Sequence, residues 1–168
     1  MGVTLALGPI CTPATSSIRG LRQSYPRGTK LAKRDPLSIA QAHLDAVNAR
    51  DLNKLAACYA DDAILEFPAS PRVEGRAAIR RAFQAFFEHW NERSDYWTIV
   101  AAGDTVAVEG TSTGTHRTLH LRIPGRVAVG GARPYRHDFA MFLTVKEGKI
   151  QRHRVYFDAR DLVHQLLQ

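Results

Sequence analysis

The sequence predicts an α+β fold, with N-terminal helices on one face of a curved, mostly antiparallel sheet and a further helix at the C-terminus. Two observations support this prediction. Apolar residues recur at helical spacing between residues 36 and 91, and from residue 96 to residue 157 they alternate with polar residues, as they do in strands. Helices followed by hairpin-connected strands are typical of domains in which the helices cover one face of the sheet.

The first helix is expected over residues 36–50, because Asp35 can cap it and Pro36 suits its first turn. Asp51 then starts a second, short helix whose inward face ends at Tyr59. We therefore expect the Tyr59 side chain to point into the domain.

A strand over residues 63–67 and a long helix over residues 77–91 are expected next. Asp158 is expected to cap the terminal helix, which packs through its leucines. The apolar stripe of the long helix comprises Ile79, Phe83, Phe86 and Trp90, and the packing leucines of the terminal helix are Leu162, Leu166 and Leu167.

The second half of the chain predicts four strands, over residues 96–102, 105–116, 135–146 and 150–157. We interpret Lys146-Glu147-Gly148 as a three-residue hairpin loop. A two-residue loop would instead turn Arg152 and Arg154 inward, and burying those charges is costly. The three-residue loop pairs Met141 with His153, Phe139 with Val155 and His137 with Phe157, all on the face that packs on the helices.

The formal charge of +7 is concentrated in the first 34 residues, which hold six basic side chains and no acidic one. The rest of the chain has 17 basic and 16 acidic groups, which argues against a nucleic-acid partner. We expect residues 1–35 to be a disordered tail and residues 36–168 to be one domain. The two cysteines, Cys11 and Cys58, fall in different parts of the chain, which fits a reducing compartment.

No apolar run is long enough to span a bilayer, so we expect no membrane partner. The predicted location is the cytoplasm. Organelle targeting by residues 1–34 is left open, since an acid-free leader with arginines and serines is also typical of a transit peptide.

Five segments together are typical of one known family: the first helix, Cys58–Ala63, Val73–Arg76, Gly114–His116 and Gly148–Asp158. They resemble the SnoaL-like polyketide cyclases and limonene-epoxide hydrolases of the nuclear transport factor 2 (NTF2-like) superfamily. The resemblance covers residues 36–168 and implies a cone-shaped domain that binds a mostly apolar small molecule, without a cofactor. It also implies a homodimer, because uncovered strand faces are commonly closed by a second copy in this superfamily.

Members of this family that do chemistry often have an aspartate where this chain has Val155. The hydrolase branch also has an arginine and an aspartate where Glu109 and Thr111 stand, so its water-activating relay is missing here. The cyclase and isomerase branches use an inward histidine or tyrosine with an acid. By that resemblance, His153 would move a proton, Glu109 would orient His153, and Tyr59 would stabilise an oxyanion.

Two functions stay open at this point: a cofactor-free cyclase- or isomerase-type enzyme, and a non-catalytic domain for ligand binding or dimerisation. The histidines lack metal-ligand spacing, so no metal site is expected. The residues expected to line the cone and bind the ligand are Phe67, Phe86, Trp90, Thr111, His137, Phe139, Met141, Val155 and Phe157.

Overall fold

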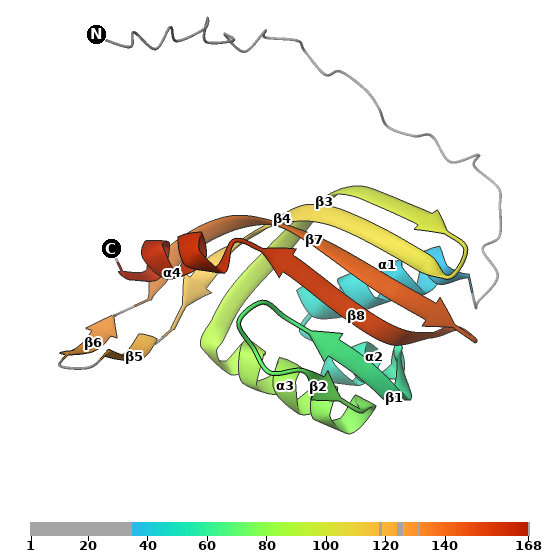
Figure 1. Cartoon of the computed structure of the whole chain (residues 1–168), viewed down its shortest axis with the longest axis horizontal. Coiled ribbons are helices and arrows are strands. Elements are labelled where there is room, and N and C mark those ends of the chain that lie inside the picture. The colour runs from blue at the N-terminus through green and yellow to red at the C-terminus, as the bar shows by residue number, and fades with distance from the viewer. Residues whose placement is uncertain (1–34, 118, 124–125, 131, 168) are drawn as a thin grey trace, which may run out of the picture. The chain divides into compact units, whose positions relative to one another are not determined.

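The computed structural model describes residues 35–117, 119–123, 126–130 and 132–167, with the backbone alone for residues 119–130. Residues 1–34 of the predicted tail, including Cys11, lie outside the described residues, whereas Asp35 is described as the cap of the first helix. The predicted order of elements is confirmed: helices come first, then long strands, then a final helix. Figure 1 shows this order by colour along the chain.

The helices begin where the sequence supplies caps. The Asp35 carboxylate accepts a hydrogen bond from the Ser38 backbone N–H at 3.2 Å, and Asp51 accepts from the N–H groups of Asn53 and Lys54. Each cap pairs backbone donors that the first helical turn leaves free. The helices are α1 (Pro36–Asn48), α2 (Leu52–Ala57), α3 (Arg76–His89) and α4 (Ala159–Leu167).

Six strands form one curved sheet in the order β2-β1-β8-β7-β4-β3. Neighbouring strands are antiparallel except β1 and β8, which run parallel. The strands are β1 (Tyr59–Glu66), β2 (Val73–Glu74), β3 (Trp90–Ala102), β4 (Thr105–His116), β7 (Arg133–Lys146) and β8 (Lys149–Phe157). The long connection after β4 contains a separate hairpin of β5 (Leu119–Ile123) and β6 (Arg126–Gly130).

The hairpin between β7 and β8 corrects the predicted register. Lys146 pairs with Lys149, so the loop has two residues, Glu147 and Gly148, and both have positive φ, as a tight hairpin turn requires. A bulge at Gln151 then adds one residue to β8 and restores the alternation. The pairs are Leu143 with His153, Met141 with Val155, and Phe139 with Phe157.

The register was therefore wrong by two residues, but the predicted faces are right. His153, Phe139 and Met141 are buried on the side of the helices, while Arg154 stays outside the core. The bulge removes the cost that argued against a two-residue loop, because it turns the arginines of β8 outward again.

The helices α1 and α3 pack against the concave side of the sheet and enclose the main core (Figure 1). Leu44, Leu55, Ile79 and Leu143 are fully buried there. The helix α4 packs on β7 through Leu162 and Leu166, together with Tyr135, whereas Leu167, expected to pack as well, is 44% exposed.

Candidate functional site

A mostly apolar cavity of about 430 Å³ lies between the helices and the concave face of the sheet. Its walls come from α1, α3, β3, β7 and β8, and from the segment that follows β1. Exposed residues such as Ser70, Ala85 and His89 stand at its rim. Aromatic and aliphatic side chains supply most of the wall, which is typical of small-molecule sites.

Two histidines, His43 and His153, line one end of this cavity, which we call its floor, and Tyr59 contacts His153 from outside the lining. The Tyr59 hydroxyl and His153 Nδ1 are 2.7 Å apart, and the ring centroids of His43 and His153 are separated by 5.0 Å. Tyr59, His43 and His153 are 0%, 1% and 2% exposed, so water does not solvate them freely. They come from β1, α1 and β8, and only the fold brings them together.

The hydrogen bond between Tyr59 and His153 fixes which ring nitrogen carries the proton. The Tyr59 hydroxyl has no other partner in the part of the chain that the structure describes, so its proton would be unpaired unless it is donated to His153 Nδ1. Burial raises the pKa of Tyr59 well above its usual value, so the hydroxyl keeps that proton. The remaining proton of neutral His153 is then on Nε2.

His153 Nε2 and His43 Nδ1 are both buried without a hydrogen-bond partner among the described residues, and both side chains line the cavity. Unpaired buried polar atoms are rare, because each costs about 1–3 kcal/mol. Burial lowers the pKa of His43 from 6.5 to about 4, and burial together with His43 lowers the pKa of His153 well below 6.5. The floor therefore presents two neutral imidazoles at pH 7, with an N–H donor at His153.

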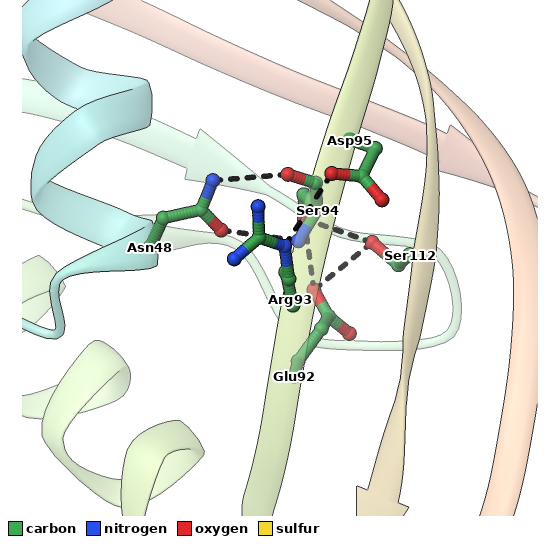
Figure 2. A network of polar contacts seen from close by, with 6 residues as sticks. All are labelled: Asn48, Glu92, Arg93, Ser94, Asp95 and Ser112. Carbon is green, nitrogen blue, oxygen red and sulfur yellow. Dashed lines mark hydrogen bonds and ion pairs between the residues drawn. The ribbon is translucent and has the colours of Figure 1, made fainter.

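A second polar group stands in the wall at the other end of the cavity, around Glu92 on β3. Its Oε2 accepts from the Tyr135 hydroxyl at 2.7 Å and its Oε1 accepts from Ser112 Oγ at 3.0 Å. Ser94 Oγ lies 3.0 Å from Ser112 Oγ and 3.4 Å from Glu92 Oε1. Figure 2 shows Glu92 turned toward these two serines.

The strand that carries Glu92 is anchored to α1. Asn48 donates to the Ser94 carbonyl at 2.9 Å and accepts from the Ser94 N–H at 3.0 Å, as Figure 2 shows. Tyr135 reaches Glu92 across β4 because Gly114, which lies between them, has no side chain. A Cβ at Gly114 would lie 2.9 Å from the Tyr135 hydroxyl oxygen. The glycine thus permits the hydrogen bond that holds the carboxylate.

The structure places most of the predicted ligand-binding residues in the cavity wall, although ligand binding by them stays a prediction. Thr111 is the exception: it does not line the cavity, and its hydroxyl donates to Asp138 at 2.7 Å on the other face of the sheet. Those in the wall are Phe67, Phe86, Trp90, His137, Phe139, Met141, Val155 and Phe157.

The expectation that Glu109 orients His153 is not supported. Glu109 is exposed and follows Val108, which points inward, so strand alternation directs the carboxylate to the outer face. Tyr59 and His153 lie in contact, with His43 as the third member of the group. The catalytic roles of Tyr59 and His153 remain predictions.

Sequence reasoning missed His43 and Glu92 as site residues. His43 occupies an inward position on α1, and a histidine in an apolar stripe was the available signal. Glu92 was not identified as a site residue because the sequence predicts a strand that begins at Tyr96, whereas β3 begins at Trp90. Its inward residues there are Glu92 and Ser94, so the usual apolar alternation is lacking.

Within the described part of the chain, no group of three or more histidine, cysteine, aspartate or glutamate side chains is arranged to hold a metal ion. None of the described helices is long and apolar enough to cross a membrane. The described polar side chains of the cavity carry imidazoles, hydroxyls, the Trp90 indole N–H and the Glu92 carboxylate.

Solved structures share this fold at low sequence identity. A proposed polyketide cyclase from Xanthomonas campestris pv. campestris superposes with a TM-score of 0.69 at 24% identity, covering 80% of this chain and 99% of its own. An LEH-like epoxide hydrolase from M. tuberculosis gives 0.62 at 20% identity, with 79% and 89% covered. A proposed ketosteroid isomerase from Kribbella flavida gives 0.55 at 22% identity, with 74% and 76% covered.

Comparison with curated proteins gives no significant match. The family model described as the SnoaL-like domain matches residues 40–153, which is more than half of the chain and includes both ends of the cavity. The match agrees with the NTF2-like fold and with the resemblance seen in the sequence. The chain therefore belongs to the SnoaL-like domain family.

Proposed function

We propose that the protein binds an apolar carbonyl compound in its cavity and catalyses cofactor-free proton transfer beside the carbonyl group. Such a step underlies isomerisation and cyclisation, and the fold is shared with a proposed polyketide cyclase and a proposed ketosteroid isomerase. The observation that supports the proposal is the floor of the cavity, where His153 has an unpaired Nε2–H and His43 has an unpaired Nδ1.

In this mechanism the carbonyl oxygen of the ligand accepts a hydrogen bond from His153 Nε2–H. The carbon–hydrogen bond next to the carbonyl breaks, its electron pair forms a carbon–carbon double bond, and the carbonyl π pair moves to oxygen. His43 Nδ1 takes the proton and later returns it. Tyr59 acts as a positioning residue, because its hydrogen bond keeps the His153 proton on Nε2.

Neutral imidazoles suit both roles. A neutral His153 is a donor that does not lose its proton at pH 7, and a neutral His43 has a lone pair available, since burial lowers the pKa of both rings. Glu92 cannot serve as the base for a carbonyl bound at His153. Glu92 contacts Tyr135, whereas His153 pairs with Leu143, eight residues further along β7, so the two lie at different ends of the cavity.

Deuterium exchange tests this proposal without knowledge of the natural substrate. The protein is incubated with 1-tetralone in D₂O, and incorporation of deuterium beside the carbonyl is followed by NMR. We expect exchange above the buffer rate, with losses of about 100-fold or more in His153→Ala and His43→Ala. Tyr59→Phe should lose less, because it removes only the positioning bond. His164→Ala, at an exposed histidine of α4 that does not line the cavity, is the matched control.

A non-catalytic binding domain is the second candidate, favoured by Val155 at a position where enzymes of this family often have an aspartate. Val155 lines the cavity and is apolar, so it offers no proton. Ligands that raise the melting temperature, with no exchange above the buffer rate for any ketone tested, would support binding alone.

A further inference from the structure

Glu92 has the features of a second ligand subsite, separate from the histidines of the floor. It lines the same cavity, is half-buried, and among the described residues no lysine, arginine or histidine nitrogen lies within ion-pair distance of it. A carboxylate in a mostly apolar wall needs hydrogen bonds or a counter-charge to offset its desolvation. The proposal below rests on the same cavity as the proposed function.

The hydrogen bonds that Glu92 receives leave part of its capacity unused. A carboxylate offers about four acceptor sites. Tyr135 fills one site of Oε2, and the two serines approach Oε1. Burial and then the Glu92 charge raise the pKa of Tyr135, so this hydroxyl stays a donor. Among the described residues, Tyr135 is the one donor to Oε2, which leaves a second acceptor site on that oxygen for a ligand.

His137 adds another unpaired polar atom near this end of the cavity. Its Nδ1 is buried without a partner, and its ring lies between Tyr135 and Phe157, with centroids 5.7 Å and 4.7 Å away. Burial lowers the pKa of His137 although the nearby acids Glu92, Asp138 and Asp161 act to raise it. His137 is therefore neutral at pH 7.5, and it does not neutralise the Glu92 charge.

Aromatic rings complete the surroundings of the carboxylate. Trp90 stacks on Phe86 with centroids 5.9 Å apart and meets Tyr135 edge-on at 5.2 Å. Such a wall is compatible with an apolar ligand body, and aromatic faces also attract cations.

We infer that Glu92 binds an N–H or O–H donor of the ligand, a protonated amine or a hydroxyl group, at the end of the cavity opposite the histidine floor. The ligand class is then an apolar compound with a hydrogen-bond donor at one end. Glu92 would select it, while Tyr135 and Ser112 hold the carboxylate in place. The subsite sets specificity and orientation and takes no part in the proton transfer at His43.

Three probes of similar shape separate the two sources of the donor. Benzylamine carries a protonated amine, benzyl alcohol carries a hydroxyl, and toluene carries neither. Binding at pH 7.5 is followed by the indole N–H resonances of the ¹⁵N-labelled protein. Trp90 lies in the wall, whereas Trp97 is 56% exposed and does not line the cavity, so it serves as the internal reference.

We expect at least one donor probe to bind about tenfold or more tightly than toluene at Trp90, as hydrogen bonds to a charged group suggest. Tighter binding of benzylamine than of benzyl alcohol would identify a protonated amine as the group that Glu92 binds. Equal binding of benzylamine and benzyl alcohol would mean that Glu92 accepts from either kind of donor. In Glu92→Gln the preference for benzylamine should disappear, while Arg93→Ala, at an exposed neighbouring position of β3 that does not line the cavity, should retain it.

Equal affinity of all three probes for the wild-type protein overturns the proposal, and this comparison does not depend on the folding of any variant. An unchanged preference in a folded Glu92→Gln protein overturns it as well. Because the probes have no carbonyl group, failure here is distinct from failure of the exchange reaction at the floor.

Discussion

The neutral histidines at the floor predict that the protein loses stability in mildly acidic solution. His43 is buried, and burial lowers its pKa from 6.5 to about 4. The unfolded chain binds this proton near pH 6.5, but the folded protein does not bind it until about pH 4. Stability from this group is therefore fully present above pH 6.5 and is lost as the pH falls toward 4.

The size of the effect follows from the two pKa values. Each pKa unit corresponds to about 1.4 kcal/mol, so the full loss from His43 is about 3 kcal/mol. Between pH 7 and pH 5 the linkage relation gives a loss of about 2 kcal/mol. His153 acts in the same direction, because burial and the neighbouring His43 lower its pKa as well.

The assay is urea unfolding of the wild-type protein and His43→Leu at pH 7 and pH 5. Leucine keeps an apolar side chain against Tyr59 and Phe83, whose rings contact His43, and removes the titrating group. The free energy of unfolding of His43→Leu should fall by about 2 kcal/mol less than that of the wild type. His164→Ala, at an exposed position, should follow the wild type. Equal losses in wild type and His43→Leu would refute the assignment of a buried neutral imidazole.

Two further predictions concern the cavity wall and the outer face of the sheet. Val155→Asp should lower the free energy of unfolding at pH 8 by about 1–3 kcal/mol relative to Val155→Asn, because the new carboxylate enters an apolar wall and Glu109 points away from it. Equal stability of these two variants in urea would contradict this. The predicted homodimer should form through the outer face, where Trp97, Phe142 and Tyr156 are exposed, so light scattering should give a dimer mass that Trp97→Arg reduces toward a monomer. A wild-type protein that is monomeric at micromolar concentration would reject this interface.

Much of the fold could be predicted because its signals are local. The caps Asp35 and Asp51, the stripe of α3 and the alternation in β4, β7 and β8 each depend on neighbouring residues, and each element is present. The parallel pairing of β1 with β8 depends on strands far apart in the chain, so alternation could not predict it. The bulge at Gln151 likewise has no local signature, although it decides the register of the last hairpin.

The candidate site was predicted less well, for a physical reason. Residues that face a functional cavity break the apolar pattern from which strands are recognised. Glu92 and Ser94 occupy inward positions of β3, and both fall between the predicted helix over residues 77–91 and the predicted strand over residues 96–102. Glu109 was expected to face inward because a carboxylate could pair with His153. Val106 and Val108 are buried, however, so strand alternation places the even-numbered residues of β4 inward and Glu109 outward.

The two glycines of β4 link the fold to both proposals. A Cβ at Gly110 would lie 3.0 Å from the Phe139 ring, and a Cβ at Gly114 would lie 2.9 Å from the Tyr135 hydroxyl oxygen. Aromatic side chains of β7 therefore cross β4 and reach β3, where Phe139 meets Tyr96 and Tyr135 holds Glu92. Glycine in a strand interior weakens the strand. The two glycines therefore lower the stability of β4 while they make room for the aromatic side chains of the cavity wall. The same arrangement separates the Glu92 carboxylate at one end from the neutral pair His43 and His153 at the other, which an elongated apolar ligand with different polar groups at its two ends would match.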